Sequence, residues 1–200
     1  MAVTCTPMSL GIFRSIRGSY VESYRRQADK IIRVLNEEFA RRCIPPYIDP
    51  DPDEHHLRRL PCGNAGASTF IALEERAKRA GLPWTLGSLR GEREIALPIP
   101  FAGKFTLPVG RTLLFFAQSQ EFCAVQTVHD ELLALAPLLH IPLAHGTLTD
   151  EIADRIADCE FLPDDDAETA GALENERVLW LDLYFAARYS LEDKTPIVIA

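Results

Sequence analysis

The sequence lacks the short motifs that mark the common enzyme and nucleotide-binding classes. It contains no G-x-S-x-G nucleophile elbow, no H-E-x-x-H helix and neither of the glycine-rich loops G-x-G-x-x-G and G-x-x-x-x-G-K-[ST]. It also has no low-complexity tract and no repeat of fixed period. We therefore expect a globular chain with no cofactor and no catalytic residue that a motif would identify, and we favour a protein that is not an enzyme.

Closely spaced cysteines are absent as well. The five cysteines never form a C-x-x-C pair; they are Cys5, Cys43, Cys62, Cys123 and Cys159. An odd, scattered set is typical of reduced thiols in a cytoplasmic protein rather than of a disulfide framework.

Long hydrophobic runs are also missing. The longest uncharged run, residues 132–149, contains two prolines and two histidines, which argues against a span of ~20 apolar residues across a bilayer. The N-terminus has no basic residue before its first apolar stretch and is a poor signal peptide. We expect a cytoplasmic protein that does not bind membranes.

Basic residues are scarce in the second half of the chain. Residues 101–200 contain six Lys/Arg and seventeen Asp/Glu, and this half carries more negative charge than the net −8 of the whole chain. Residues 1–43, in contrast, have a net charge of +4. Because acidic surfaces repel nucleic acid and anionic membranes, we expect a basic protein partner and no nucleic acid. The oligomeric state is left open.

Hydrophobic periodicity predicts several amphipathic helices. Apolar residues recur at three- and four-residue steps over Tyr20–Arg42, with Ser19 and Glu22 as a capping box, and a second long helix is predicted over Ala167–Ser190. Shorter helices are expected at 68–79, 123–135 and from Thr147 or Thr149 through Asp158. Thr112–Ala117 is the best candidate for a buried strand, and the terminal PIVIA is another. The mixture predicts a single α+β domain over residues 1–200, with amphipathic helices packed on a small mixed or antiparallel sheet.

The stretch IDPDPDEHHLRRL, residues 48–60, begins like a calcium loop. Asp49, Asp51 and Asp53 alternate, but an EF-hand needs Gly at the sixth position and Glu at the twelfth, where this chain has Glu54 and Leu60. The adjacent histidines are an incomplete zinc set. We therefore predict no metal and interpret the segment as an extended, charged connector whose Asp51 and Asp53 contact a partner.

The segment CGNAGAST, residues 62–69, leaves an enzymatic alternative open. A cysteine beside a turn that enters a helix can have a lowered pKa, so Cys62 could be a nucleophile with His55, His56 or His129 as its base. The simpler interpretation is a tight turn, with Gly63 and Gly66 supplying backbone freedom. The alternatives are thus a small thiol-dependent hydrolase or transferase, and a small-molecule sensor domain.

The acidic residues before the last helix give the main functional prediction. Asp150, Asp154 and Asp158 are spaced four apart and line up on one side of a helix, where like charges repel one another. The run Asp164, Asp165 and Asp166 follows, and Asp166 can cap the next helix. We predict that these six aspartates bind a partner. The leading hypothesis is a cytoplasmic binding protein that neutralises or regulates a protein through this acidic surface, as a bacterial toxin-immunity protein would.

Overall fold

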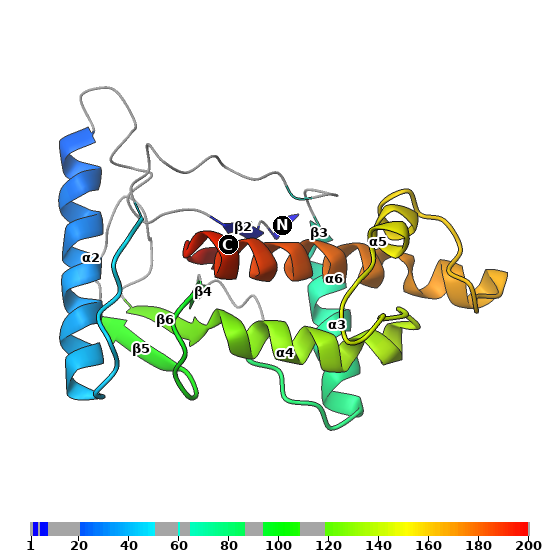
Figure 1. Ribbon diagram of the computed structural model, residues 1–200, viewed down its shortest axis with the longest axis horizontal. Helices are drawn as coiled ribbons and strands as arrows, with labels where there is room; N and C mark the ends of the chain where they lie inside the picture. Colours follow the sequence, from blue (N-terminus) through cyan, green and yellow to red (C-terminus); the bar gives the residue numbers. More distant parts are fainter. Residues whose placement is uncertain are drawn as a thin grey trace.

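The computed structural model describes residues 2–3, 5–7, 21–50, 60, 65–86, 94–108 and 119–199. Its helices are α2 (Val21–Arg41), α3 (Ala67–Arg79), α4 (Val125–Leu135), the short 3-10 helix η1 (Ala136–Leu139), α5 (Asp150–Ala157) and α6 (Ala167–Asp193) (Figure 1). Its strands are β1 (Ala2–Val3), β2 (Cys5–Pro7), β3 (Ala65–Gly66), β4 (Glu94–Leu97), β5 (Phe105–Pro108), β6 (Ser119–Ala124) and β7 (Ile197–Ile199).

The main sheet is small and mixed. Its strands follow the order β2-β7-β4-β6-β5, and β4 pairs with β6 in parallel while the other neighbours are antiparallel. A separate antiparallel pair joins β1 to β3. This arrangement confirms the predicted α+β class, with amphipathic helices packed on a small mixed sheet.

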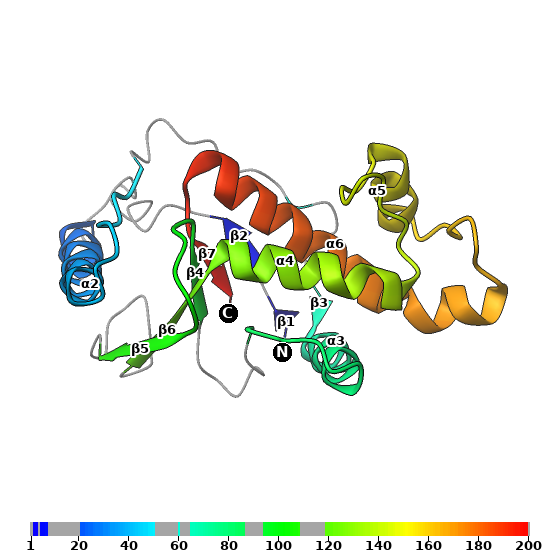
Figure 2. The same cartoon turned by 60° about the horizontal axis from the view of Figure 1, so that its bottom comes forward.

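One face of the sheet packs against α2. The apolar stripe of α2 places Ile31, Leu35 and Phe39 at four-residue steps, and each side chain is almost completely buried. The stripe meets alternate residues of the strands, namely Ile95, Leu97, Phe105, Leu107 and Phe122. The α2 side of the sheet thus has its own hydrophobic cluster, and Figure 2 shows α2 across the sheet from α4 and α6.

The opposite face packs against α4 and α6, and the helices α3, α5 and η1 pack in turn against α6. Ala96 of β4 points to this side, whereas its neighbours Ile95 and Leu97 point to α2, so all of β4 is buried. Trp180 of α6 is fully buried, and its Nε1 donates a hydrogen bond to the carbonyl of Leu132 at 2.7 Å. α6 runs from the sheet to α5 at the far end of the molecule (Figures 1 and 2).

The predicted element bounds agree closely for the long helices and differ at the start of α4. α2 and α6 lie within a few residues of the predicted ranges, but the helix predicted over 123–135 begins at Val125, because the two preceding residues finish β6. The predicted strand Thr112–Ala117 and the capping residue Ser19 lie outside the described residues. In the described part of the chain, no helix is both long and apolar enough to span a bilayer.

Candidate functional site

Helix α5 has one buried face and one charged face. Its N-cap residue Thr149 accepts a hydrogen bond from the backbone N–H of Ile152 at 3.4 Å, as the sequence predicts for a helix start here. The side chains that α5 buries against the core are Ile152, Ala153 and Ile156. Packing of this apolar face fixes the direction of the opposite, acidic face.

The predicted aspartate ladder lies on the exposed side of α5. Asp150 and Asp154 are exposed in the helix, and Asp158 is exposed as its C-cap residue. Glu151 is exposed beside them. Four carboxylates therefore project into solvent from α5 and its C-terminal cap.

Asp165 differs from its neighbours because its carboxylate is buried. Arg177 of α6 donates to both of its oxygens, and the side chains of Asp165 and Arg177 are 0% and 4% exposed. The backbone N–H of Leu162 also donates to Asp165, at 2.9 Å. The hydrogen bonds from Arg177 hold the pKa of Asp165 below its usual range. Asp165 is thus a structural anchor for the loop between α5 and α6, and we remove it from the predicted binding residues.

Asp164 and Asp166 remain exposed on the same loop. Asp166 is the N-cap of α6, where its Oδ1 accepts a hydrogen bond from the backbone N–H of Thr169 at 2.8 Å, as predicted. This bond lowers the pKa of the Asp166 carboxyl group. Both carboxylates therefore lie on the surface at the start of α6.

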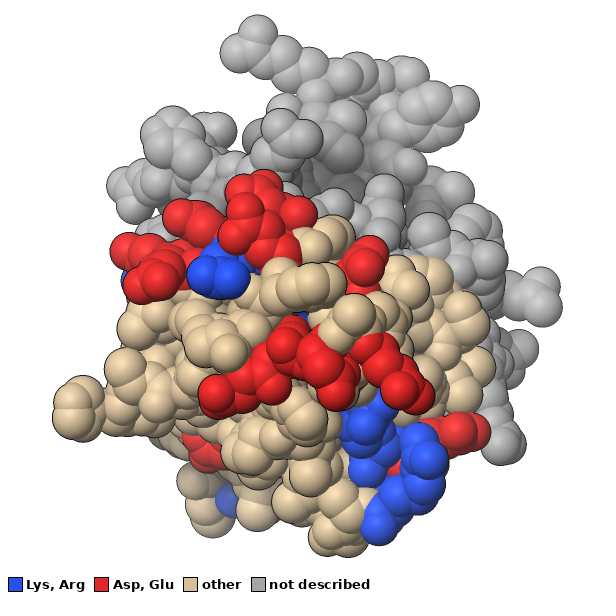
Figure 3. All heavy atoms as spheres, turned by 90° about the vertical axis from the view of Figure 1, so that its right-hand side faces the viewer, with Lys and Arg blue, Asp and Glu red and all other residues tan. Residues whose placement is uncertain are grey.

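The exposed carboxylates of α5, the α5–α6 loop and the first turns of α6 form what we call the acidic end. Its nine members are Asp150, Glu151, Asp154, Asp158, Glu160, Asp164, Asp166, Glu168 and Glu174. Figure 3 shows acidic side chains gathered in a cluster and a band on this end of the molecule. Five of the six aspartates predicted on this part of the chain belong to it.

The positive charge within the acidic end belongs to Arg155, which is hydrogen-bonded to the backbone. Arg155, the one basic residue between positions 150 and 176, donates from Nε to the carbonyl of Phe161 at 2.9 Å and lies 3.9 Å from Glu160. In the described part of the chain, no other member of the acidic end is in a salt bridge. Most of these carboxylates therefore face solvent without a cationic neighbour.

The last turn of α3 borders this region with basic residues. Arg76, Lys78 and Arg79 occupy that turn, and Arg76 reaches α6, where Nε and Nη2 each donate to Glu176 at 2.7 Å. A group of basic side chains lies beside the acidic band in Figure 3. Glu176 is buried in this contact and does not belong to the acidic end.

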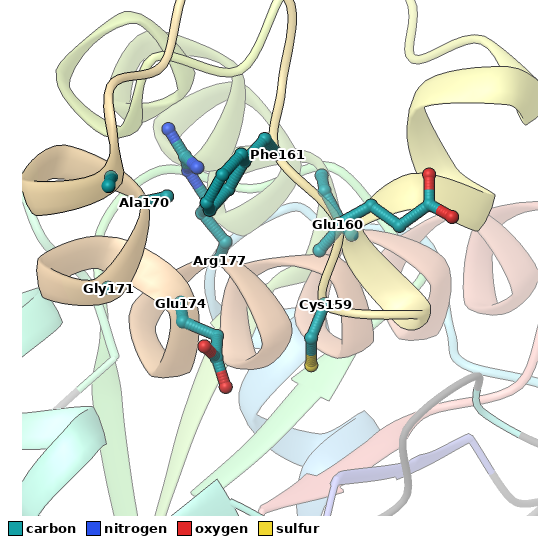
Figure 4. Close-up of a pocket in the computed structure, with 9 residues that line it drawn as sticks. Cys159, Glu160, Phe161, Ala170, Gly171, Glu174 and Arg177 are labelled. Carbon is teal, nitrogen blue, oxygen red and sulfur yellow. The ribbon is translucent and has the colours of Figure 1, made fainter.

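A small pocket lies within the acidic end, between α5, the following loop and α6. Its volume is about 110 Å³, and Figure 4 shows several of its side chains. The lining residues are Ile156, Cys159, Glu160, Phe161, Ala167, Ala170, Gly171, Glu174 and Arg177. Sequence reasoning missed Phe161 and Glu174. A bulky apolar residue within an acidic stretch was the available signal for Phe161, which is 55% exposed.

The other predicted site residues are not described. Asp51 and Asp53, predicted to bind a partner, lie outside the described residues. So do Cys62, the candidate nucleophile, and His55 and His56, two of its candidate bases. The thiol-enzyme alternative is therefore untested.

The described histidines and cysteines do not form a reactive cluster. The imidazole of His129 packs against Tyr184, with ring centroids 5.5 Å apart, and burial raises the pKa of the Cys123 thiol to about 12. No three His, Cys, Asp or Glu side chains among the described residues are arranged to hold a metal ion.

Comparison with known proteins gives one match. Residues 98–199 match the model of a family described as “Putative DNA-mimic protein”. The matched region is just over half of the 200-residue chain and contains the whole acidic end. No curated protein and no solved structure matches the chain. The family description agrees with the coarser part of the functional hypothesis, an acidic protein that acts by binding.

The same match corrects the predicted partner. Nucleic acid was excluded on the ground that an acidic surface repels it. For a DNA mimic that argument is incomplete, because the negative charge that repels DNA also imitates its phosphates and suits proteins that bind DNA. The prediction of a basic protein partner with no involvement of nucleic acid is therefore corrected, because the family description relates this chain to DNA through mimicry.

Proposed function

The chain belongs to the family described as “Putative DNA-mimic protein”, and from that premise we propose that its acidic end occupies the DNA-binding surface of another protein and excludes DNA from it. The observation that carries the proposal is the concentration of nine exposed carboxylates on one end of the fold, with Arg155 as the one basic residue in that stretch.

The spacing of these charges is close to that of a DNA strand. Asp150 and Asp158 are separated by about 12 Å along the axis of a helix that rises ~1.5 Å per residue. The four exposed carboxylates in that interval give one negative charge per roughly 3–4 Å, and one strand of DNA carries a phosphate per about 3.4 Å of axis. A surface that contacts successive phosphates can therefore meet a similar charge density on α5.

Repulsion between these charges destabilises the free protein. Asp150, Asp154 and Asp158 are separated by four-residue steps, at which like charges on a helix destabilise it. The described part of the chain supplies no salt-bridge partner for any of the three. Lys and Arg side chains of a DNA-binding surface would relieve this repulsion and accelerate association.

The scaffold beneath the acidic end is held in place before any partner arrives. Asp165 and Arg177 join the loop to α6, and Arg177 Nε also donates to the carbonyl of Leu139 at 2.7 Å. Thr149 and Asp166 cap the two helices that carry most of the carboxylates. A pre-ordered surface loses less conformational entropy on binding, which favours affinity.

A toxin-neutralising role fits this proposal as a special case. A toxin that cleaves or modifies DNA must bind DNA, so a DNA mimic would block it at that surface. Contacts from Asp51 and Asp53, a cytoplasmic location and a single domain over residues 1–200 stay predictions.

Affinity capture with DNA as the eluent tests the proposal. The protein is immobilised and exposed to a lysate of its native cells treated with nuclease, so that DNA does not bridge proteins. After nuclease removal, bound proteins are eluted with a short DNA duplex. We expect the duplex to release a DNA-binding protein. Capture of proteins that duplex DNA does not displace would contradict the proposal.

A pair of charge-reversed variants provides the control for this experiment. Asp154→Lys alters the acidic end, and Glu37→Lys makes the same change in net charge at an exposed site on α2. Loss of capture with Asp154→Lys alone would locate the interaction at the acidic end. Equal loss with both variants would mean that overall charge, and not this surface, is responsible.

A further inference from the structure

The pocket in the acidic end has an apolar floor and an acidic rim. Ile156 of α5 is buried, and Ala170 and Gly171 contribute a smooth face of α6. Glu160 and Glu174 are exposed at its margin. Its volume of about 110 Å³ is well below the ~300–1,000 Å³ typical of drug-sized ligands, so it suits one side chain better than a small-molecule effector.

The two arginine side chains near this pocket already have hydrogen-bond partners. Arg177 lines it with its stem, but its guanidinium is engaged by Asp165 and by the carbonyl of Leu139. Arg155 is bonded to the carbonyl of Phe161. Glu174 has no salt-bridge partner among the described residues, so the rim retains negative charge.

Phe161 gives the pocket an aromatic wall that solvent reaches. In Figure 4 its ring lies beside the side chain of Arg177, whereas Glu174 and Cys159 point together toward the other side of the pocket. Phe161 is 55% exposed, and its carbonyl is fixed by Arg155. An exposed ring on one side of the pocket and a carboxylate without a cationic partner on the other side are a favourable setting for a flat cation, because the ring face attracts positive charge.

We propose that this pocket receives an arginine side chain from the DNA-binding surface of the partner. The guanidinium would stack on Phe161 and pair with Glu174, and the aliphatic stem would lie on Ile156 and Ala170. Arginine fits better than lysine because its planar head stacks on aromatic rings and can donate two hydrogen bonds to one carboxylate. The inference rests on the proposed function for the source of the arginine.

A peptide titration tests the pocket without the partner. The full chain, labelled with ¹⁵N, is titrated with the capped tripeptide Gly-Arg-Gly, and matched titrations use citrulline or lysine in the central position. Citrulline keeps the shape of arginine and removes its charge. We expect the arginine peptide to shift the amide signals of Cys159, Phe161, Gly171 and Glu174 with the highest affinity, and the citrulline peptide to leave them unchanged.

Two variants locate the binding. Phe161→Ala should weaken the arginine peptide by roughly two- to fivefold, as loss of an exposed cation–π contact predicts, and Glu174→Gln should weaken it by a similar factor. Ile48→Ala, which removes another exposed apolar side chain (80% exposed) outside the acidic end, should have no effect. Equal affinity for the three peptides, or no change with Phe161→Ala and Glu174→Gln, would overturn the inference.

The partner experiment separates this inference from the proposed function. If duplex DNA displaces a captured partner but the arginine peptide does not shift the pocket signals, the pocket inference fails and the DNA-mimic function stands. If the peptide binds at the pocket and no captured protein is displaced by DNA, the arginine site stands and the proposed function fails.

Discussion

Arg177 donates to both carboxylate oxygens of Asp165, with 2.6 Å between Nη2 and Oδ1, and neither side chain has appreciable contact with solvent. The pair fixes the loop that leads from α5 to α6. It also explains why three consecutive aspartates have different roles: Asp164 faces solvent, Asp165 anchors the loop and Asp166 caps α6.

Asp165→Asn should therefore be strongly destabilising. It leaves the buried Arg177 without its counter-charge, a change that costs about 3–5 kcal/mol in comparable buried pairs. Urea denaturation at neutral pH measures the difference. Asp164→Asn is the matched control, and as an exposed substitution it should change the free energy of unfolding by less than about 0.5 kcal/mol. Similar values for the two variants would contradict a buried, structural Asp165.

The contribution of the Asp165 pair should also depend on pH in a defined direction. Because the pKa of Asp165 is lowered in the folded protein, its stabilising effect is complete above the unfolded pKa of ~3.9. The effect is lost as the pH falls from there through the lowered folded pKa. The difference in unfolding free energy between wild type and Asp165→Asn should thus be constant from pH 8 to pH 5 and shrink only in stronger acid. A difference that declines between pH 8 and pH 6 would require another titrating group.

The two hydrophobic clusters should unfold together. Ile31 and Trp180 are buried on opposite faces of the sheet, and replacing either by Ala should cost about 2–5 kcal/mol. Thermal and urea unfolding should show one transition that each substitution lowers, with nearly additive effects in the double variant. Two separate transitions, each sensitive to one substitution, would contradict the prediction of a single domain.

The periodicity of the sequence predicted the helices well because their apolar stripes are local patterns. The start of α4 was predicted two residues early, since the strand character of Cys123 and Ala124 comes from pairing with β4, which lies far away in the sequence.

The site was predictable only in part, because contacts between residues far apart in the sequence also shape it. Spacing alone placed Asp150, Asp154 and Asp158 on one exposed helix side. It did not distinguish Asp165 from the adjacent aspartates, because Arg177, the partner that buries it, lies twelve residues away on α6. The pocket beside Phe161 likewise results from the packing of α5 against α6, which no local pattern encodes.

Glu174 should control the reactivity of the neighbouring thiol. The pKa of Cys159 is raised by partial burial and by the charge and hydrogen bond of Glu174, which lowers the thiolate fraction at neutral pH. Glu174→Gln should therefore increase the rate at which iodoacetamide alkylates Cys159 near pH 8, followed by mass spectrometry of the peptide. Glu37→Gln on α2 should leave the rate unchanged. The same mass spectrometry also measures the alkylation rate of Cys62. That rate should be unusually fast if the chain is a thiol-dependent enzyme.

Asp154→Lys should slow association with a captured DNA-binding partner. Replacing the central carboxylate of the ladder removes an attraction that acts before contact, so the on-rate should fall more than the off-rate rises. Wild-type association should also weaken steeply as salt increases past ~0.15 M, where the screening length is about 8 Å. Surface plasmon resonance across a salt series measures both rates, with Glu37→Lys as the control of equal net charge. An unchanged on-rate for Asp154→Lys would contradict a contact at the acidic end.

Competition with DNA on the purified partner tests the central claim most directly. A fluorescent duplex is titrated with the partner at several fixed concentrations of this protein, and the apparent Kd for DNA is read from anisotropy. If the acidic end occupies the DNA-binding surface, the apparent Kd rises in proportion to the added protein without reaching a plateau, and no ternary complex forms. A plateau in the apparent Kd, or a complex that contains the partner, DNA and this protein together, would contradict the account.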